Sequence, residues 1–173
     1  GSNNAVVSIQ MPVDADASTL YWSNAIGSGI DSGSTGCPLL VDGVLIVCAG
    51  DMICRVDPVS GEILTKAKMD RASSFSITPP AYANGMVFVG LSDGTIQAFN
   101  AETLQSLWIY HDPLEGQPNS PITVCGDYLY TGFWRSEESP ANFVCLSITD
   151  EDPARTDEEK TACWYWTNPG GYY

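Results

Sequence analysis

Residues 79–108 read PPAYANGMVFVGLSDGTIQAFNAETLQSLW, and residues 37–65 read CPLLVDGVLIVCAGDMICRVDPVSGEILT. Both stretches contain the same parts in the same order: a proline, a turn glycine, an apolar strand, a turn with Asp and Gly, and further short strands. A fixed internal period of about 20 to 50 residues is the signature of a repeat architecture. This repeat decides the fold more than any single motif does.

The same prolines and glycines recur in a third copy further along the chain. The prolines are 42 and 41 residues apart, and a glycine follows each of them five residues later. The three pairs are Pro38 with Gly43, Pro80 with Gly85, and Pro121 with Gly126. A bulky residue closes most units, namely Trp22, Trp108 and Trp164, whereas Thr65 holds this place in one copy. We expect the glycines to form turns and the tryptophans to pack the repeat units together.

The segments between the turns are short and rich in β-branched and aromatic residues, and none shows helical periodicity. These features predict an all-β chain. Four strands in about 42 residues are typical of a β-propeller blade. A β-sandwich is the rival fold, but it gives no reason for Pro, Gly and Trp to recur at one period. The prediction is therefore a partial β-propeller of about three to four four-stranded antiparallel blades.

The predicted boundaries place the whole chain, residues 1–173, in one propeller segment. Blades are expected at about 34–65, 75–108 and 119–166, with 1–22 ending a preceding blade and 167–173 beginning a following one. Such an arc exposes two apolar flanks, which soluble monomers seldom tolerate. Three arrangements would cover them: further blades of a longer protein, self-association of two arcs, or residues 1–22 folded back as part of a fourth blade.

The string at 90–108, with its apolar strand, Asp-Gly turn and closing Leu-Trp, resembles the repeat of pyrroloquinoline-quinone-type (PQQ-like) β-propellers. Residues 56–64 are similar to the same template, and the resemblance covers roughly 20–166. That family includes quinoprotein dehydrogenases, the outer-membrane assembly scaffold and bacterial surface propeller proteins. The resemblance implies the fold. It argues against quinone binding, because the quinone enzymes use a vicinal cysteine pair and no two cysteines are adjacent here.

The chain carries a net charge of −14, from 21 acidic and seven basic residues. Such a charge repels phosphate backbones and anionic bilayers, so nucleic-acid binding and membrane-surface roles are disfavoured. The longest apolar run, residues 44–49, is far shorter than a spanning helix requires, and no membrane insertion is expected. Few lysines and an acidic surface suggest an extracellular or cell-envelope protein. Gly1 and Ser2 resemble the remnant of a removed tag, so an export signal could not be seen here.

Six cysteines and one histidine show no zinc-ligand spacing. If Gly50 and Asp51 form a two-residue turn, Cys48 lies opposite Ile53 and faces away from Cys54. Free thiols are favoured over disulfides, and most of the cysteines are expected to be small buried apolar residues. The four expected to be buried are Cys37, Cys48, Cys145 and Cys163.

Two sets of residues are candidate sites. The loops on one side of the propeller would carry a binding rim, formed by Trp134, Arg135, Glu137, His111 and Asp112. The acidic run in the loop 149–160 would offer carboxylates to a hard cation such as Ca²⁺, through Asp150, Asp152 and Asp157. The rival interpretations are ordinary solvated loops and a hydrated run of charge. The two loops 135–141 and 149–160 are expected on opposite faces, so they cannot form one site.

No nucleophile elbow, phosphate loop or metalloprotease motif occurs in the sequence, and no cofactor is predicted. The leading hypothesis is a non-catalytic β-propeller interaction module that binds protein or glycan at the bacterial cell surface or envelope. One alternative is a fragment of a quinone-dependent dehydrogenase-like enzyme. Another is a structural spacer domain.

Overall fold

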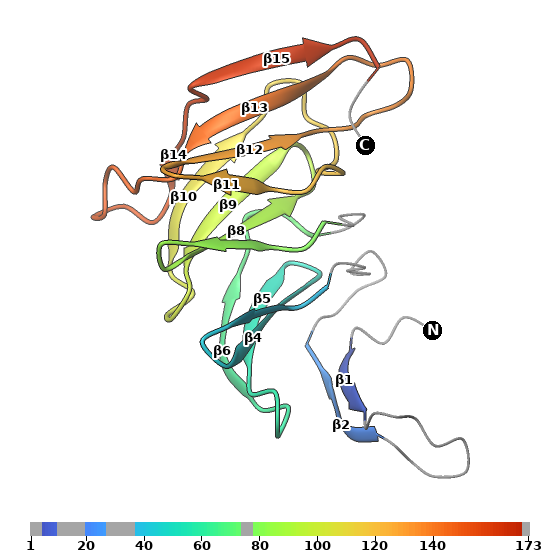
Figure 1. Ribbon diagram of the computed structural model, residues 1–173, viewed down its shortest axis with the longest axis vertical. Coiled ribbons are helices and arrows are strands. Elements are labelled where there is room, and N and C mark those ends of the chain that lie inside the picture. Colours follow the sequence, from blue (N-terminus) through green and yellow to red (C-terminus); the bar gives the residue numbers. More distant parts are fainter. Residues whose placement is uncertain (1–4, 10–19, 27–36, 74–77, 171–173) are drawn as a thin grey trace.

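The computed structural model describes residues 5–9, 20–26, 37–73 and 78–170, and all of its regular structure is β (Figure 1). Predictions that concern Gly1 and Ser2, the first residues of the first two predicted blades, and residues 171–173 lie outside the described residues. Within the described ranges no helix is long and apolar enough to span a membrane.

Three consecutive four-stranded antiparallel units follow one another along the chain, and we call them blades 1, 2 and 3. Blade 1 contains β3 (Leu39–Val41), β4 (Val44–Ala49), β5 (Met52–Val56) and β6 (Ile63–Lys68). Blade 2 contains β7 (Ala81–Ala83), β8 (Met86–Leu91), β9 (Thr95–Asn100) and β10 (Ser106–His111). Blade 3 contains β11 (Thr123–Cys125), β12 (Tyr128–Gly132), β13 (Ala141–Ser147) and β15 (Trp164–Asn168).

A smaller sheet precedes blade 1. Strands β1 (Ala5–Ile9) and β2 (Leu20–Ala25) form an antiparallel pair whose Trp22 packs against blade 1. In the described residues this small sheet covers the outer face of blade 1, and the other two arrangements remain predictions. The chain forms an arc of three full blades and one two-stranded blade.

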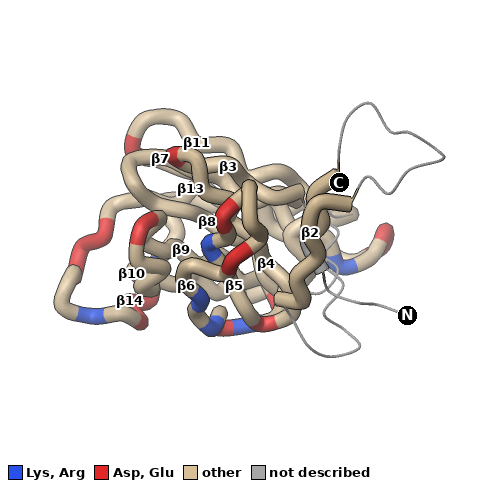
Figure 2. Tube along the Cα trace, turned by 90° about the horizontal axis from the view of Figure 1, so that it is seen from below, with Lys and Arg blue, Asp and Glu red and all other residues tan. Residues whose placement is uncertain are grey.

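The blades are arranged radially. Their first strands β3, β7 and β11 contact one another in succession and lie together in Figure 2, whereas the later strands of successive blades spread apart. Stacked layers of a sandwich would not bring only the first strands together. The radial arrangement confirms the predicted partial propeller and excludes the sandwich.

Apolar residues fill the spaces between successive sheets. One cluster joins β2 to blade 1 through Ile26 and Val56, a second joins blades 1 and 2 through Ile53 and Phe99, and a third joins blades 2 and 3. Each full blade therefore presents one face of alternating side chains to the blade before it and the other face to the blade after it. Blade 3 has no following blade in the described chain.

The turn between the first two strands of each blade explains why the glycines recur. In blades 1 and 2 the two central residues both have positive φ, +48° and +79° at Asp42 and Gly43, and +52° and +76° at Asn84 and Gly85. Two-residue hairpin turns of this type require such dihedrals. Gly126 instead takes the first turn position, since Cys125 pairs with Tyr128. Its φ of +60° lies in the left-handed region, which favours a glycine.

Strand β14 (Glu158–Glu159) is an element that the repeat did not predict. It belongs to the long loop of blade 3 but pairs in parallel with β10, where it becomes the fifth strand of the blade 2 sheet. The backbone N–H of Lys160 also donates to the carbonyl of Ile109 at 2.7 Å. The insertion therefore fastens blade 3 to the outer edge of blade 2.

Candidate functional site

Two predicted rim residues, Trp134 and Arg135, lie against the link that joins blades 2 and 3. Trp134 and Gln117 exchange two backbone hydrogen bonds, of 2.7 and 2.8 Å. Gly116 sits between them with a φ of +106°, and a Cβ there would lie 2.8 Å from the Arg135 side chain and the Trp134 carbonyl. The loop after β12 is thus held closely to the link. Glu137 lies further along the same loop and is exposed.

Asp112 is buried and does not belong to the rim, contrary to the prediction. Its carboxylate accepts hydrogen bonds from the Tyr110 hydroxyl at 3.0 Å and the Leu114 backbone N–H at 3.0 Å, and both of its oxygens accept from Asn142. Asn142 in turn accepts a hydrogen bond from Thr167. Burial, followed by the Asp112 charge, raises the pKa of Tyr110 above its ordinary value. Asp112 therefore connects blades 2 and 3, and both of its carboxylate oxygens accept hydrogen bonds from groups within the protein.

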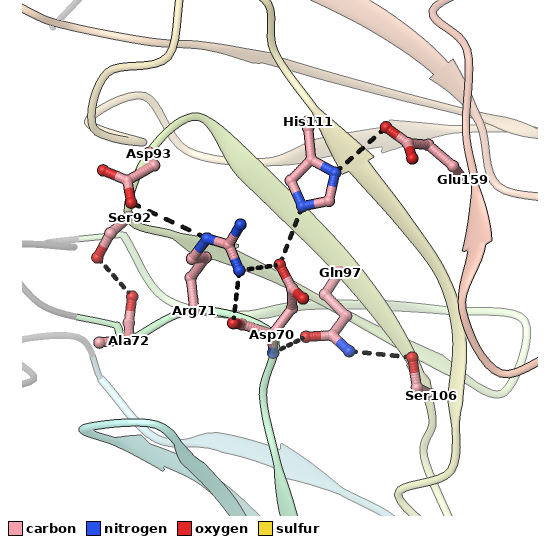
Figure 3. Close-up of polar contacts among 9 residues, drawn as sticks. All are labelled: Asp70, Arg71, Ala72, Ser92, Asp93, Gln97, Ser106, His111 and Glu159. Atoms are coloured by element: carbon pink, nitrogen blue, oxygen red, sulfur yellow. Dashed lines mark hydrogen bonds and ion pairs between the residues drawn. The ribbon is translucent and has the colours of Figure 1, made fainter.

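His111 points toward Asp70 and Glu159, in a polar cluster formed by three blades (Figure 3). Its Nε2 lies 2.9 Å from an Asp70 carboxylate oxygen, and its Nδ1 lies 3.3 Å from a Glu159 carboxylate oxygen. Asp70 follows blade 1, His111 ends blade 2, and Glu159 belongs to the insertion from blade 3. One imidazole therefore joins three blades. Alternation along β10 places His111 and Asp112 on opposite faces, and this separation accounts for their different environments.

The same cluster continues from Asp70 to the last two strands of blade 2 and to the turn before them (Figure 3). The Asp70 backbone N–H donates to the Gln97 side chain at 2.8 Å, and Gln97 donates to Ser106 at 2.9 Å. Arg71 pairs with Asp70 at 3.0 Å and approaches Asp93 at 3.9 Å. The Asp70 carboxylate lies at the centre of the cluster, within hydrogen-bond distance of both His111 and Arg71. Its geometry is that of an interblade connection.

The acidic insertion (149–160) is organised around a lysine. Glu158 accepts the backbone N–H groups of Glu151 and Asp152 at 3.2 and 2.9 Å. The buried Lys160 ammonium donates to the Thr149 carbonyl, lies 3.5 Å from Glu151, and sits 5.4 Å from the centre of the Trp108 ring. The sequence suggested either hydrated charge or a cation site. Glu158 and Lys160 are instead buried in the structure.

The predicted cation ligands are Asp150, Asp152 and Asp157. Asp157 pairs with Arg155 at 3.4 Å. Burial and the nearby Glu158 charge raise the pKa of Asp150, and one of its oxygens is buried with no hydrogen-bond partner. In the part of the chain that the structure describes, no three His, Cys, Asp or Glu side chains are arranged as metal ligands.

The recurring tryptophans have different surroundings. Trp22 lies over Gly61 of blade 1 and donates its indole N–H to the Pro58 carbonyl at 3.0 Å. Trp108 is fully buried and donates to the Ile148 carbonyl of blade 3 at 3.1 Å. Both contacts reach the segment just after the third strand of the next blade. Trp164 holds the same place in blade 3, but it is 48% exposed.

Trp164 lies in a face that sequence analysis did not identify as a site. The strand register puts Tyr130, Cys145 and Trp164 side by side, and the neighbouring pairs add further aromatics. We call this surface the aromatic face; its ring-bearing residues are Tyr128, Tyr130, Phe143, Trp164 and Trp166. The corresponding face of blade 2 holds Phe88 and Trp108, with ring centres 5.8 Å apart, buried beneath blade 3. Tyr130 and Trp164 reproduce that pair at 6.1 Å in the open. Alignment of Trp108 with Trp164, 56 residues apart because blade 3 carries an insertion, was the signal that could have revealed the face.

The opposite end of the arc is also open. On the side of β1 and β2 that faces away from blade 1, Val7 and Tyr21 are exposed by 55% and 65%.

A groove of about 370 Å³ lies between blades 1 and 2 and is lined by Arg55, Tyr82 and Glu102 among others. Its lining is both polar and apolar, and the sequence did not predict it.

Two of the other expectations concern cysteines. Cys48 pairs with Ile53, as predicted, and Cys48 and Cys145 are buried. Cys37 and Cys163 are exposed, so the expectation of burial was wrong for them. Cys37 precedes the first strand of blade 1 and Cys163 precedes the last strand of blade 3, where each lies at the margin of its blade.

The fold and its repeated interblade contacts define a PQQ-like β-propeller, present here as an arc of blades. A family described as "Outer membrane protein assembly factor BamB" matches residues 9–138, and the chain belongs to this family. A protein of that description from Burkholderia pseudomallei (strain K96243) is 29% identical over 136 residues, which cover 73% of this chain and 31% of the relative. The chain thus spans about a third of that relative's length.

Solved structures share the fold at low identity. BamB from Moraxella catarrhalis superposes with a TM-score of 0.63 at 16% identity, over 90% of this chain and 49% of that protein. Quinohemoprotein alcohol dehydrogenase ADHIIG from Pseudomonas putida HK5 also gives 0.63, at 19% identity, over 81% of this chain and 21% of the enzyme. The computationally designed Ika8 protein gives 0.59 at 16% identity, over 99% of this chain and 49% of the design.

Proposed function

We propose that this chain acts as a non-catalytic β-propeller module for protein recognition in the bacterial envelope, and that its two end faces dock a second copy of the chain. The observation that carries the proposal is the aromatic face. Its aromatic residues repeat the arrangement on the face of blade 2 that lies buried beneath blade 3. On blade 3 the same arrangement is exposed. The family membership and the outer-membrane assembly role in the relatives' name support the envelope and the scaffold role.

The docking contact is expected to run from head to tail. The aromatic face of one copy would meet the outer side of β1 and β2 in the other, where Val7 and Tyr21 are exposed. Both surfaces are apolar and aromatic, and their burial removes the two flanks that make an isolated arc unfavourable in water. A head-to-tail contact closes into a ring when the rotation per copy permits it.

The lengths of two structural neighbours favour a pair of arcs. The chain spans 49% of BamB from Moraxella catarrhalis and 49% of the designed Ika8 protein. Two arcs of this size therefore supply about as many blades as either whole protein contains. Complete propellers usually have four to eight blades, so a ring of two arcs lies within the normal range.

The absence of catalytic machinery is part of the proposal. The polar clusters around His111 and Asp112 are saturated by partners from neighbouring blades. The sequence has no adjacent cysteines of the kind that quinone enzymes of this fold use. We place recognition of a further protein or glycan on the rim of Trp134, Arg135 and Glu137, because this loop is held to the preceding link by Gly116.

Light scattering coupled to size-exclusion chromatography tests the docking at micromolar concentration. The wild-type chain is expected to elute with the mass of two copies. Trp166→Glu places a charge on the aromatic face, where Trp166 is 69% exposed, and is expected to elute as a monomer. Tyr165→Glu is the matched control, because Tyr165 is 60% exposed on the neighbouring position of the other face and should leave the pair intact. A wild-type monomer, or a pair that both variants retain, would contradict the proposal.

A further inference from the structure

The last strand of blade 3 begins with a bulge that brings two cysteines together. Cys145 is paired with Trp164, and the backbone N–H of the preceding Cys163 donates to the Cys145 carbonyl at 2.9 Å. Two consecutive residues on one strand, Cys163 and Trp164, therefore oppose one residue on the other. This two-against-one pairing is the definition of a β-bulge.

The other two blades contain the same irregularity. In blade 2 the register passes from Ser106 to Trp108 and skips Leu107. Leu107 packs into the apolar cluster that also contains Trp108 and Ala98. The side chain of the bulged residue therefore lies on the same face of the sheet as the side chain of Trp108. Blade 1 skips Leu64 at the same place. Cys163 takes the position of these leucines, which puts its thiol on the aromatic face with Cys145.

The distances suit a covalent link. Opposed residues of antiparallel strands have Cα atoms about 4.5 to 5.5 Å apart. Disulfides join Cα atoms separated by about 4.4 to 6.8 Å. The backbone hydrogen bond of 2.9 Å holds Cys163 beside Cys145, and burial is the main cause that raises the pKa of Cys145. Cys163 is exposed and can be reached from solvent.

We propose that Cys145 and Cys163 form a disulfide when a small-molecule disulfide is present as oxidant. The exposed Cys163 thiolate attacks one sulfur of the oxidant, forms a mixed disulfide and releases one thiol. The Cys145 sulfur then loses its proton and attacks Sγ of Cys163, which releases the second thiol. Two protein thiols are oxidised, one external disulfide is reduced to two thiols, and the two protons end on these leaving thiols.

The bridge would enclose the acidic insertion. Residues 149–160 lie between the two cysteines and carry β14, which is the outer strand of blade 2. A covalent link at the base of this loop would restrict both β14 and the adjacent Trp164. The redox state of one thiol pair would thereby influence the connection between blades 2 and 3. This inference concerns contacts within one chain and does not require the docking of a second copy.

The other close pair of cysteines serves as an internal comparison. Cys48 and Cys54 lie on adjacent strands, but Cys48 pairs with Ile53 and belongs to the cluster facing blade 2. Cys54 belongs to the cluster facing Trp22. Their side chains occupy opposite faces of the sheet, so they are expected to remain thiols.

Peptide mapping tests the proposal directly. Cys37→Ser and Cys125→Ser remove two exposed thiols, which leaves four cysteines. The folded protein is kept below the micromolar range, where the aromatic face is uncovered, and is treated with oxidised glutathione. The remaining thiols are then alkylated under denaturing conditions and the chain is digested with trypsin. Cleavage after Arg135, Arg155 and Lys160 separates Cys145, in peptide 136–155, from Cys163, in peptide 161–173.

We expect the two peptides to be joined, two of the four thiols to be lost, and reductant to reverse both changes. Adding Cys163→Ser should abolish the link and leave the thiol of Cys145 unoxidised. A glutathione adduct that persists on Cys163, a link to Cys48 or Cys54, or four unchanged thiols would overturn the proposal. Circular dichroism of each variant before oxidation establishes that the blades are folded.

Discussion

At the scale of single residues, the repeat is held together by complementary sizes on adjacent blades. The wide Trp22 side chain meets Gly61, which has no side chain. In blade 1 the smaller Thr65 takes the place that Trp22 has in the preceding sheet. In blade 2 the buried Leu104, with a φ of +58°, takes the turn position that Gly61 has in blade 1. The contact of Trp22 with Gly61 thus places a large side chain on one unit against a residue without a side chain on the next.

Gly61→Ala tests this complementarity. A Cβ at Gly61 would lie 2.5 Å from the Trp22 ring, and the φ of +74° adds backbone strain. Gly43→Ala is the matched control, since its φ is +79° and nothing lies within 4 Å. We expect Gly43→Ala to lower the free energy of unfolding by about 1 kcal/mol. Gly61→Ala should cost a further 1 to 3 kcal/mol, roughly the usual cost of overpacking, in urea denaturation. Equal losses would show that Trp22 does not pack there.

Asp57 gives a pH-dependent prediction. Hydrogen bonds from Ser60, first from its backbone and then from its side chain, and from the Val59 backbone lower the pKa of Asp57. A lowered folded-state pKa adds stability that is present above the unfolded value of 3.8 and disappears as the pH falls through the folded value. Asn100 makes the same turn in blade 2, so Asp57→Asn should preserve the geometry.

The expected result is a change of slope. As the pH falls below about 5, the Tm of the wild type should fall more steeply than that of Asp57→Asn, because only the wild type loses the stabilisation by the carboxylate. If the Tm of both proteins changed equally with pH over this range, the turn would stabilise the carboxyl and carboxylate forms of Asp57 equally.

At the scale of elements, the regular strands of each blade were predictable from sequence and the insertion was not. Period, turn glycines and apolar alternation depend on residues close together in the chain, as in the pairing of Cys48 with Ile53. Strand β14 has two residues and pairs with β10, about 50 residues earlier, so no local pattern marks it. For the same reason, the burial of Asp112 could not be foreseen, because it depends on Asn142 in another blade.

Lys160 is the residue by which β14 can be tested. Its ammonium is buried between Glu151, Glu158 and the Trp108 ring. Lys160→Met should leave the carboxylate of Glu158 without its buried partner and lower the free energy of unfolding by about 1 to 3 kcal/mol. It should also accelerate tryptic cleavage after Arg155 in the folded chain.

Lys68→Met provides the control for Lys160→Met. Lys68 pairs with Asp51 at 3.5 Å, but its side chain is 76% exposed. The loss should therefore stay within about 0.5 kcal/mol, as for most exposed ion pairs. Similar losses in both variants would indicate that the insertion is not anchored through Lys160.

At the scale of the whole molecule, the arc has two ends that differ from all of its internal interfaces. Inside the arc each blade is covered by the one that follows it, as Trp108 of blade 2 is covered by blade 3. At the end of blade 3 the same arrangement of aromatics is uncovered. The sequence predicted that apolar flanks would be exposed, but it could not show that the open face is richer in aromatic residues than the interfaces within the arc. This difference is why the aromatic face, rather than the predicted rim, is central to the proposed function.

Hydroxyl-radical footprinting against protein concentration tests the aromatic face most directly. Trp164 and Trp166, both in tryptic peptide 161–173, should be oxidised in dilute protein and become protected as the concentration rises through the micromolar range. Trp108, in peptide 72–135, should be protected at every concentration because it is fully buried. Oxidation of Trp164 and Trp166 that does not change with concentration would contradict the docking of a second copy on this face.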